Sequence, residues 1–326
     1  MIRIATVGTS KICDSFIGGM KKTGRFELSA VYSRKTETGT DFARRHGAEN
    51  VFTDLEKLAE WDGIDAVYIA SPNSCHVPQS RIFLGNGKHV ICEKPIVTSS
   101  EEYTGLKSMA DRNDLIFMEA MIPRHIKRYR EVKAAVGSVG KILSAKIDYS
   151  QRSSRLDSFL KGNRVNIFDM SLHAGALMDL GVYCVYGAVD FFGKPKSKTA
   201  DAYFLENGAD GSGRAVFYYD GFSAEISYSK ICQGVAGSEI TGENGVVKIK
   251  YISQYAGVGI VKNGVETGIV GYPEREELMR DEAEKFADYL ENSESFSDDY
   301  ESASRLCLNV HQCMDEIKRK AKIKYG

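Results

Sequence analysis

Short apolar segments alternate with longer amphipathic ones over the first 122 residues of the chain. The apolar segments predict strands, at Arg3–Val7, Phe26–Tyr32, Ala66–Ala70, His89–Cys92 and Leu115–Met118. Strands that alternate with helices of about ten residues form a parallel sheet covered by helices on both faces. This alternation restricts residues 1–122 to an α/β doubly wound fold.

Helix signals fall between these strands. One helix is expected from about Thr36 to His46 and another from about His76 to Asn86. Thr53–Glu56 has the capping-box pattern, in which a hydroxyl and a carboxylate three residues later satisfy backbone N–H groups at a helix start. Ser99–Glu102 is expected to cap a further helix that ends near Asn113.

The pattern changes after residue 122. Alternating segments begin at Ile142, and Asp220-Gly221, Asn244-Gly245 and Asn263-Gly264 between them are hairpin-turn signals. They predict a second domain, residues 123–326, of the α+β class with an open, mostly antiparallel sheet. Helices at about 273–290 and 300–320 close the chain, and the last is expected to pack back on the first domain. A chain of 326 residues is long enough for two cores.

Composition excludes several classes of partner. A formal net charge of −1 gives no electrostatic case for nucleic acid or an anionic membrane. No apolar run approaches the ~20 residues that span a bilayer, and Met1–Ala5 enters a strand without the layout of a signal peptide. The seven cysteines are odd in number and form no C-x-x-C pair, so we expect reduced thiols, no metal site and a cytoplasmic location. Cys307 and Cys313 are expected to be packing residues, and the basic run 124–130 a solvated helix face.

The turn after the first strand stands where a dinucleotide fold places G-x-G-x-x-G. It reads Gly8-Thr9-Ser10-Lys11-Ile12-Cys13, so only the first glycine is present. The first glycine makes the tight turn, and the second lets the backbone approach a pyrophosphate. Ser10 is small and can donate a hydrogen bond. We therefore expect Gly8 to Ile12 to bind the cofactor, with Ser10 and Cys13 as departures from the motif.

The end of the second strand indicates which cofactor binds. An acidic residue there binds the ribose 2′-hydroxyl of NAD, whereas an arginine accommodates the 2′-phosphate of NADP. The sequence is Ser33-Arg34-Lys35-Thr36, with no acid before Glu37. It favours NADP over NAD, with Arg34 on the phosphate and Ser33 and Lys35 beside it. The alternative is that these residues only cap the next helix, since Thr36 and Thr38 are reasonable caps.

Two further segments carry candidate catalytic groups. The strand from His89 ends in Glu93-Lys94-Pro95, and ligands of parallel sheets bind at such strand ends. Lys94 is either an ammonium that orients a substrate hydroxyl or a surface lysine. Asp179 and Tyr183 are four residues apart in an apolar segment, so on a helix they share a face. They form either part of an active site or a buried Asp–Tyr hydrogen bond.

The Glu-Lys-Pro signature comes after a series of alternating β/α units. In this the chain resembles the Gfo/Idh/MocA oxidoreductases, and most of all their dimeric dihydrodiol and D-xylose dehydrogenase branch. The resemblance implies a Rossmann domain, a second α+β domain, and Tyr183 as acid/base with Asp179 beside it. The run of glycines before that pair in the family is here His173-Ala174-Gly175. The resemblance also implies that Asn73 and His76 line the nicotinamide end of the crevice, with Ser71 and Pro72 among the cofactor-binding residues. It implies that Glu93 meets the nicotinamide ribose, that Glu119 and Met121 lie at the floor of the active site, and that Arg124 lies close to the substrate or the cofactor. His76 could instead be a helix residue that faces solvent.

The resemblance implies a hydride transfer between nicotinamide and a carbinol or carbonyl carbon of a sugar, polyol or cyclic diol. A tyrosine is a poor base at neutral pH because its pKa is about 10, and the ammonium of Lys94 would lower that pKa. Two alternatives remain: a nicotinamide-dependent glycosidase-type hydrolase and a non-catalytic NAD(P)-binding sensor. We expect a homodimer through the open sheet face, where 215–219 is apolar on both sides, and specificity from the loop 151–166.

Overall fold

The computed structural model describes residues 1–325. Its chain divides into two compact units. The first comprises Met1–Ile126 and Glu274–Arg305, and the second comprises Lys127–Pro273 and the chain from Leu306 onward. The boundary predicted at residue 122 falls inside the first unit, and the chain returns to this unit after the second sheet is complete.

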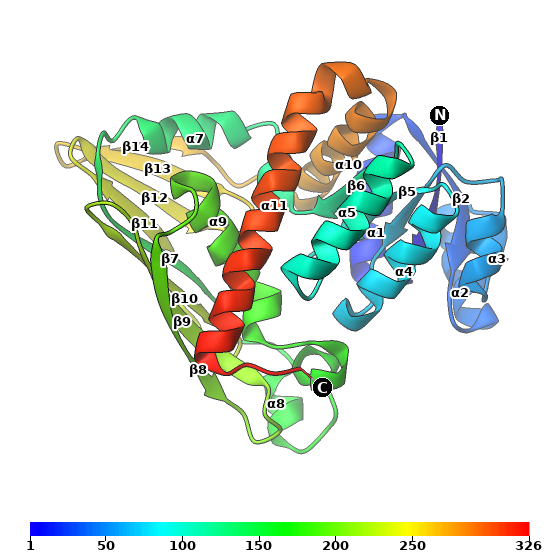
Figure 1. Ribbon diagram of the computed structural model, residues 1–326, viewed down its shortest axis with the longest axis horizontal. Coiled ribbons are helices and arrows are strands. Elements are labelled where there is room, and N and C mark those ends of the chain that lie inside the picture. Colours follow the sequence, from blue (N-terminus) through cyan, green and yellow to red (C-terminus); the bar gives the residue numbers. More distant parts are fainter. Residues whose placement is uncertain (326) are drawn as a thin grey trace. The chain divides into compact units, whose positions relative to one another are not determined.

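The first unit is built on a six-stranded sheet with the order β3-β2-β1-β4-β5-β6 (Figure 1). Every neighbouring pair is parallel. The order reverses between β1 and β4, and ligands of such sheets bind at the carboxyl ends of the strands near this point. The strands are β1 (Ile2–Val7), β2 (Phe26–Tyr32), β3 (Asn50–Phe52), β4 (Ala66–Ile69), β5 (His89–Glu93) and β6 (Phe117–Ala120).

Helices follow each strand of this sheet. Ser99 caps one of them with a complete capping box, in which Ser99 and Glu102 each bond the other's backbone N–H. At the earlier predicted box, Asp54 is the cap instead, and its carboxylate accepts from the N–H groups of Glu56 and Lys57. The helices are α1 (Lys11–Thr23), α2 (Thr36–His46), α3 (Leu55–Glu60), α4 (Asn73–Gly85), α5 (Ser100–Arg112) and α6 (Ile122–His125).

The helix α10 (Arg275–Glu291) belongs to the first unit because it packs on α1. A Cβ at Gly19 of α1 would lie 2.5 Å from the backbone nitrogen of Arg280, so this close approach requires glycine. Arg25 also pairs with Asp288 and Glu291, at 2.6 Å each. The last helix, α11 (Ser293–Ala321), begins in the first unit and ends in the second.

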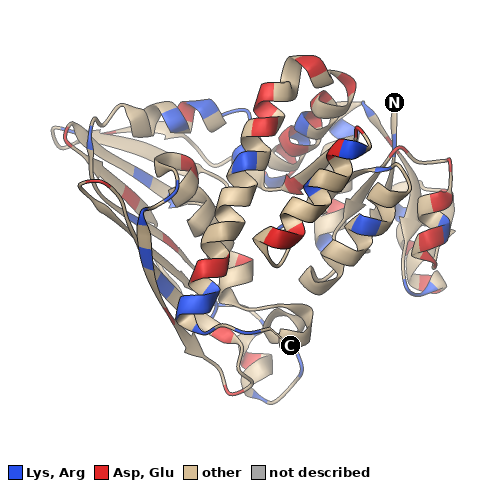
Figure 2. Ribbon diagram, in the orientation of Figure 1, with Lys and Arg blue, Asp and Glu red and all other residues tan. Residues whose placement is uncertain are grey.

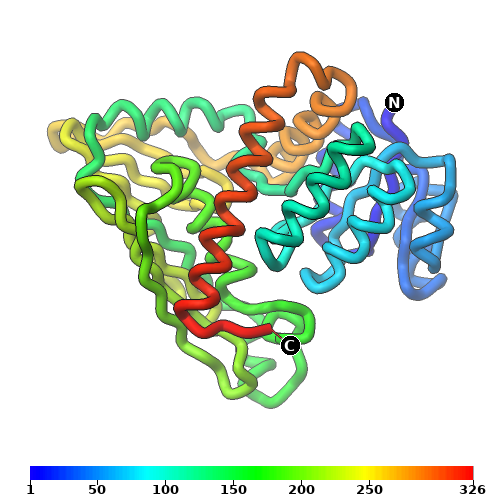
Figure 3. Tube along the Cα trace, in the orientation of Figure 1, coloured from blue at the N-terminus to red at the C-terminus, as the bar shows by residue number. Residues whose placement is uncertain are grey.

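The second unit is built on an eight-stranded sheet with the order β14-β13-β12-β11-β7-β10-β9-β8. Figure 3 follows the chain of this unit through the sheet in colours that run from green to yellow. The strand β7, the first of this sheet in the sequence, lies between β11 and β10. The pair β7 and β10 is parallel, and the other pairs are antiparallel. The strands are β7 (Ile142–Ser150), β8 (Ser197–Phe204), β9 (Asp210–Tyr218), β10 (Ser223–Ser229), β11 (Ser238–Gly242), β12 (Gly245–Tyr251), β13 (Ala256–Lys262) and β14 (Val265–Val270).

The helical part of this unit is more irregular. It includes α7 (Tyr129–Gly137), α8 (Leu156–Leu160), 3₁₀ turns at Asn166–Phe168 and Met170–Leu172, a π-helical turn at Leu177–Gly181, and α9 (Val182–Phe192). The stretch Met170–Phe192 is long and apolar enough to cross a membrane, contrary to our expectation that no run would be. However, 72% of its most apolar window is buried inside the protein, as is usual for a core helix.

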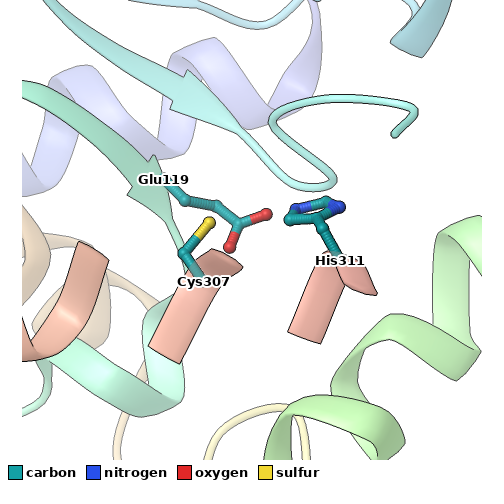
Figure 4. A group of neighbouring side chains, drawn as sticks. All are labelled: Glu119, Cys307 and His311. Atoms are coloured by element: carbon teal, nitrogen blue, oxygen red, sulfur yellow. The ribbon is translucent and has the colours of Figure 1, made fainter. Parts of the chain in front are cut away.

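The basic run 124–130 is not the single solvated helix that we predicted. It is divided between α6 and α7, and Arg124 and His125 are buried. Elsewhere, basic and acidic residues are interspersed with one another along the helices and strands of both units (Figure 2). On α11, Cys307 and Cys313 are buried, as packing residues are. Figure 4 shows Cys307 and His311 on this helix, with Glu119 on β6.

Candidate active site

The turn from β1 to α1 forms despite the two missing glycines. Gly8 has a φ of 121°, and a Cβ there would lie 3.0 Å from the carbonyl oxygen of Ala70, so this position requires glycine. Cys13 is buried beneath the turn. Ser10 precedes α1 without a side-chain cap, so the first N–H groups of the helix are not bonded by it. Such a helix start can bind a phosphate through its N–H groups and dipole.

The segment after β2 presents two exposed cations. Arg34 and Lys35 are exposed, and neither has an ion-pair partner within residues 1–325. Ser33 is buried, and its hydroxyl accepts a hydrogen bond from the N–H of Lys35. The helix α2 begins at Thr36 with Lys35 as its N-cap and no side-chain cap. Thr36 therefore does not cap the helix.

His76 on α4 joins the loops that follow β4 and β5. Its Nδ1 lies 2.8 Å from the carbonyl oxygen of Pro95, and its Nε2 lies 2.8 Å from that of Ser71. Because the ring is buried, its pKa is lowered. The alternative that His76 faces solvent is wrong. The helix begins at Asn73 rather than His76, with Pro72 as N-cap, and the Ser71 hydroxyl donates to Gln79 at 2.6 Å.

Glu93 and Lys94 lie where β5 ends. Tyr68 of β4 donates a hydrogen bond of 2.6 Å to Oε1 of Glu93. Burial raises the pKa of Glu93, and the bond from Tyr68 and the charge of Lys94 oppose that rise. Lys94 is partly buried, and the Lys94–Pro95 peptide bond is cis. His76 therefore holds the loop that carries Lys94, because it contacts the carbonyl oxygen of the next residue, Pro95.

The residues predicted after β6 are buried. Oε1 of Glu119 accepts a hydrogen bond of 3.0 Å from the N–H of Ile96, so Glu119 braces the same loop. Met121 is fully buried. Arg124 donates to the carboxylate of Asp299 at 2.8 Å. Although burial acts to raise the pKa of Asp299, the bond and charge of Arg124 bring it below its ordinary value.

Sequence reasoning missed a fully buried acidic residue of the first unit. Glu282 on α10 is fully buried, and neither of its carboxyl oxygens has a hydrogen-bond partner within residues 1–325. Burial and then the charge of Glu93 raise its pKa, Glu119 adds to the rise, and Arg275 opposes it. Burial without a hydrogen-bond partner favours the protonated form of such a carboxyl. The signal that could have found it is a glutamate on the apolar face of a helix.

In the second unit, the turn before Asp179 is set by Asp210. The Asp210 carboxylate accepts a hydrogen bond of 2.6 Å from the N–H of Leu177, and a Cβ at Gly175 would lie 1.9 Å from its Oδ1. Burial raises the pKa of Asp210 to about 7. Gly175 is therefore required even though the two residues before it are not glycine. The segment Leu177–Gly181 is π-helical rather than α-helical, and such turns are frequent at functional sites.

Asp179 and Tyr183 have different neighbours. Oδ2 of Asp179 lies 2.5 Å from Nζ of Lys230, a residue that sequence reasoning missed. The ring of Tyr183 packs edge-on against that of Tyr149, with centroids 5.8 Å apart. The sequence offered only Tyr183 as a neighbour of Asp179, and the structure adds the ammonium of Lys230.

The predicted specificity loop borders a cavity of about 270 Å³. Two of its arginines are paired, Arg152 with Asp157 at 2.7 Å and Arg164 with Asp169 at 2.6 Å. The cavity lies within the second unit and is lined by Phe159, Arg164, Val165, Phe168, Asp169, Met170, Ser171 and Asn207.

The structure thus gathers the candidate residues into two groups. Those of the first unit follow β1, β2, β4, β5 and β6, whose parallel arrangement brings their carboxyl ends to one edge of the sheet. Asp179 and Tyr183 lie on the helical segment of the second unit. The first unit therefore has a dinucleotide-binding fold, and the second unit carries an acid and a tyrosine on one helical segment.

Family models match both parts of this chain. Residues 2–121 match the oxidoreductase family with an NAD-binding Rossmann fold, and residues 129–248 match the GFO/IDH/MocA C-terminal domain. The chain belongs to the Gfo/Idh/MocA family of oxidoreductases. This confirms the predicted family and fold class, and it makes the protein an NAD(P)-dependent oxidoreductase.

Named members of the Gfo/Idh/MocA family are similar over most of the chain. The scyllo-inositol 2-dehydrogenase (NADP(+)) IolU of Bacillus subtilis is 37% identical over 325 residues, which cover 100% of this chain and 98% of that protein. A trans-1,2-dihydrobenzene-1,2-diol dehydrogenase of Xenopus tropicalis is 25% identical and covers 74% of this chain and 72% of that protein.

A solved structure shares the Gfo/Idh/MocA fold along the whole chain. It is the 3-ketoreductase KijD10 of Actinomadura kijaniata, in complex with NADP and TDP-benzene. The TM-score is 0.85 at 21% identity, and the match covers 98% of this chain and 97% of that chain. At this identity, the likeness shows the fold alone.

Proposed function

We propose that this protein transfers a hydride between NADP and a carbinol or carbonyl carbon of a cyclic polyol, a sugar or a cyclic diol. The observation that carries the proposal is the similarity to IolU over the whole chain. The relative that acts on a dihydrodiol supports the same class of secondary alcohol. A ring carbon that bears a hydroxyl is common to the substrates that these two names describe.

The first unit is the NADP-binding part of this proposal. The pyrophosphate is bound at the start of α1, where Gly8 allows close approach and no side chain caps the helix. The 2′-phosphate is bound by Arg34, with Ser33 and Lys35 beside it. The guanidinium is exposed and has no ion pair within residues 1–325. This supports the assignment, because it can form charge-assisted bonds to a phosphate without first breaking an ion pair.

The other first-unit residues are assigned to the nicotinamide end. Ser71, Pro72, Asn73 and Glu93 line it, while His76 and Glu119 fix the loop that carries Lys94. Arg124 and Met121 support the floor. The buried position of Arg124 and its pair with Asp299 favour a bracing role over a direct contact with substrate.

Nicotinamide supplies the hydride chemistry, and the chain supplies proton transfer and orientation. The phenol oxygen of Tyr183 takes the hydroxyl proton during oxidation and returns it during reduction. The ammonium of Lys94 orients the reacting oxygen and favours the ionised form of the phenol. Asp179 orients these groups. Positioned proton transfer of this kind contributes about 10²–10⁴-fold to the rate.

The protein acts as a homodimer in the cytoplasm. Along β9, Phe217 is buried, whereas Tyr218 on the opposite face is exposed, as is Tyr203 of the neighbouring β8. This exposed face of the sheet supports association with a second copy. No disulfide joins the seven cysteines of the described residues, which is compatible with a reducing compartment. A monomeric mass by light scattering at micromolar concentration would contradict the dimer.

A substrate screen tests the function directly. The purified protein is mixed with NADP or NAD and a panel of inositols, aldoses and trans-diols, and reduction of the cofactor is followed by absorbance. We expect reduction with NADP and at least one cyclic polyol or diol. Release of an aglycone from glycosides without net cofactor reduction would instead indicate the hydrolase. Binding of NADP without turnover of any panel member would indicate the sensor.

A further inference from the structure

Lys230 is a buried cation that the proposed mechanism does not use. It follows β10, and its side chain is only 4% exposed, whereas that of its partner Asp179 is 41% exposed. A buried ammonium needs a counter-charge and hydrogen-bond acceptors. Lys230 has both, because Nζ lies 2.5 Å from Oδ2 of Asp179 and 3.4 Å from the carbonyl oxygen of Ile167.

The position of this ammonium is determined from several sides. The backbone N–H of Lys230 donates to Gly211, and its carbonyl accepts from Ser153, at 2.9 Å each. Its Nζ also lies 5.5 Å from the ring centroid of Phe168. The chain around Lys230 is therefore fixed by neighbouring segments of the second unit, while Asp179 is on the π-helical turn that leads to Tyr183.

The same contacts link the ammonium to the cavity. Phe168 lines the 270 Å³ cavity, and Ile167 precedes it in the same 3₁₀ turn. Lys230 thus joins two elements that are separate in the sequence: the cavity wall at Ile167–Phe168 and the helical turn at Asp179. An ion pair at this place can hold the turn in one position relative to the wall.

We propose that Lys230 is a positioning residue of the active site, which fixes the carboxylate of Asp179 and thereby the π-helical turn that leads to Tyr183 on α9. The proposal rests on the proposed function for its effect on turnover. The pairing itself does not depend on it. Since Lys230 acts through Asp179, its loss lowers kcat by misplacing the reacting groups and leaves the NADP site of the first unit unchanged.

The chain offers a matched control. Lys198 on β8 is also buried, with a side chain 3% exposed, and it pairs at 2.7 Å with Glu316, which is 45% exposed. Its Nζ lies 5.9 Å from the ring centroid of Phe217. Lys198→Met therefore removes a lysine of the same unit that is also buried, paired with a half-exposed carboxylate and close to a phenylalanine ring, and it leaves the contacts of Asp179 unchanged.

The first test uses stability and needs no substrate. Thermal midpoints are measured for Lys230→Met, Asp179→Asn, the double variant and the wild type. Asp179→Asn leaves a buried ammonium without its counter-charge, so the midpoint falls. We expect Lys230→Met to lower the midpoint less in the Asp179→Asn background than in the wild type, or to raise it there. An equal effect in both backgrounds would overturn the pairing.

The second test measures turnover and NADP dissociation constants. We expect Lys230→Met to lower kcat by about tenfold or more, with the NADP dissociation constant within about twofold of wild type. Lys230→Arg, which keeps the charge, should recover part of kcat. The role is overturned if Lys230→Met turns over as fast as Lys198→Met, or if Lys230→Arg loses as much as Lys230→Met. If the wild type converts no substrate of the panel, the proposed function fails, and the stability cycle still decides whether Lys230 holds Asp179.

Discussion

Two candidate residues of the first unit, His76 and Glu119, are held by backbone atoms, whereas Asp179 in the second unit is held by the charge of another side chain. His76 lies between two carbonyl oxygens, and Glu119 accepts from a backbone N–H. Asp179 instead pairs with the ammonium of Lys230. Backbone contacts between neighbouring strand ends suit a rigid cofactor site. A paired carboxylate on a π-helical turn suits a site in which charge and proton position matter.

This comparison predicts that substitutions in the two units affect different measured quantities. The largest effect is expected in the second unit, at the phenol of Tyr183. Tyr183→Phe removes only the hydroxyl, so kcat should fall by more than about tenfold with NADP binding largely unchanged. Asp179→Asn should lower kcat less if Asp179 only orients its neighbours. Near-normal turnover of Tyr183→Phe would remove the acid/base assignment.

Lys94 is the residue of the first unit for which we expect an effect on chemistry rather than binding. Lys94→Ala should lower kcat by more than about tenfold, because it removes the ammonium that orients the reacting oxygen. The NADP dissociation constant, measured by fluorescence titration, should stay close to that of wild type. A variant with intact kcat and weakened NADP binding would place Lys94 among the residues that only bind the cofactor.

Arg34 should show the opposite behaviour. Arg34→Ala should weaken NADP about tenfold or more, since a hydrogen bond to a charged group contributes about 1.5–3 kcal/mol, and leave NAD within about threefold. The control is Arg44→Ala. It removes an exposed arginine of α2, which follows Arg34 in the chain, and Arg44 pairs with Asp41 of that helix. Equal weakening of both cofactors in Arg34→Ala would show that the guanidinium does not bind the 2′-phosphate.

The smallest effect is expected at Glu282, and it concerns stability. The pKa of Glu282 is raised in the folded protein, whereas in the unfolded chain a glutamate has a pKa of about 4.3. Above that pH, the unfolded chain loses a proton that the folded protein keeps. Stability therefore falls as pH rises through this window, by at most about 1.4 kcal/mol per pH unit. Glu282→Gln should raise the thermal midpoint at pH 8 and have little effect near pH 4.

The control for this experiment is Glu277→Gln, which changes an exposed glutamate of the same helix. Its midpoint should follow that of wild type at both pH values. A Glu282→Gln protein that is less stable than wild type at pH 8 would show that the carboxyl is charged and paired, and would contradict its assignment as a buried neutral acid.

The sequence predicted those parts of the fold that depend on local pattern. The helix Thr36–His46 and the cap at Ser99 were predicted correctly, because periodicity and capping act over a few residues. At Thr53–Glu56, an aspartate one position later competes for the same N–H groups and is the cap instead. The three-residue strand β3 was not predicted, since so short a segment has no clear periodicity.

Candidate residues of the first unit could be proposed from the strand order. Lys94 and Arg34 were proposed because each lies just after an apolar strand, whereas Asp179 and Tyr183 were proposed from their spacing and the family resemblance. Lys230 was missed because its pairing with Asp179 depends on how distant segments of the second unit pack together. The one local signal is a lysine between β10 and the apolar residues Ile231 and Cys232, which needs a partner if it is buried.

The most direct test of the account compares Arg34→Ala and Tyr183→Phe with wild type in one set of assays. For each protein, the NADP dissociation constant and kcat at saturating NADP are measured with the best cyclic polyol or diol from the screen. We predict that Arg34→Ala weakens NADP binding and keeps kcat within about threefold, while Tyr183→Phe keeps NADP binding and loses more than about tenfold in kcat. Parallel losses of binding and kcat in both variants would contradict a division between a binding unit and a reacting unit.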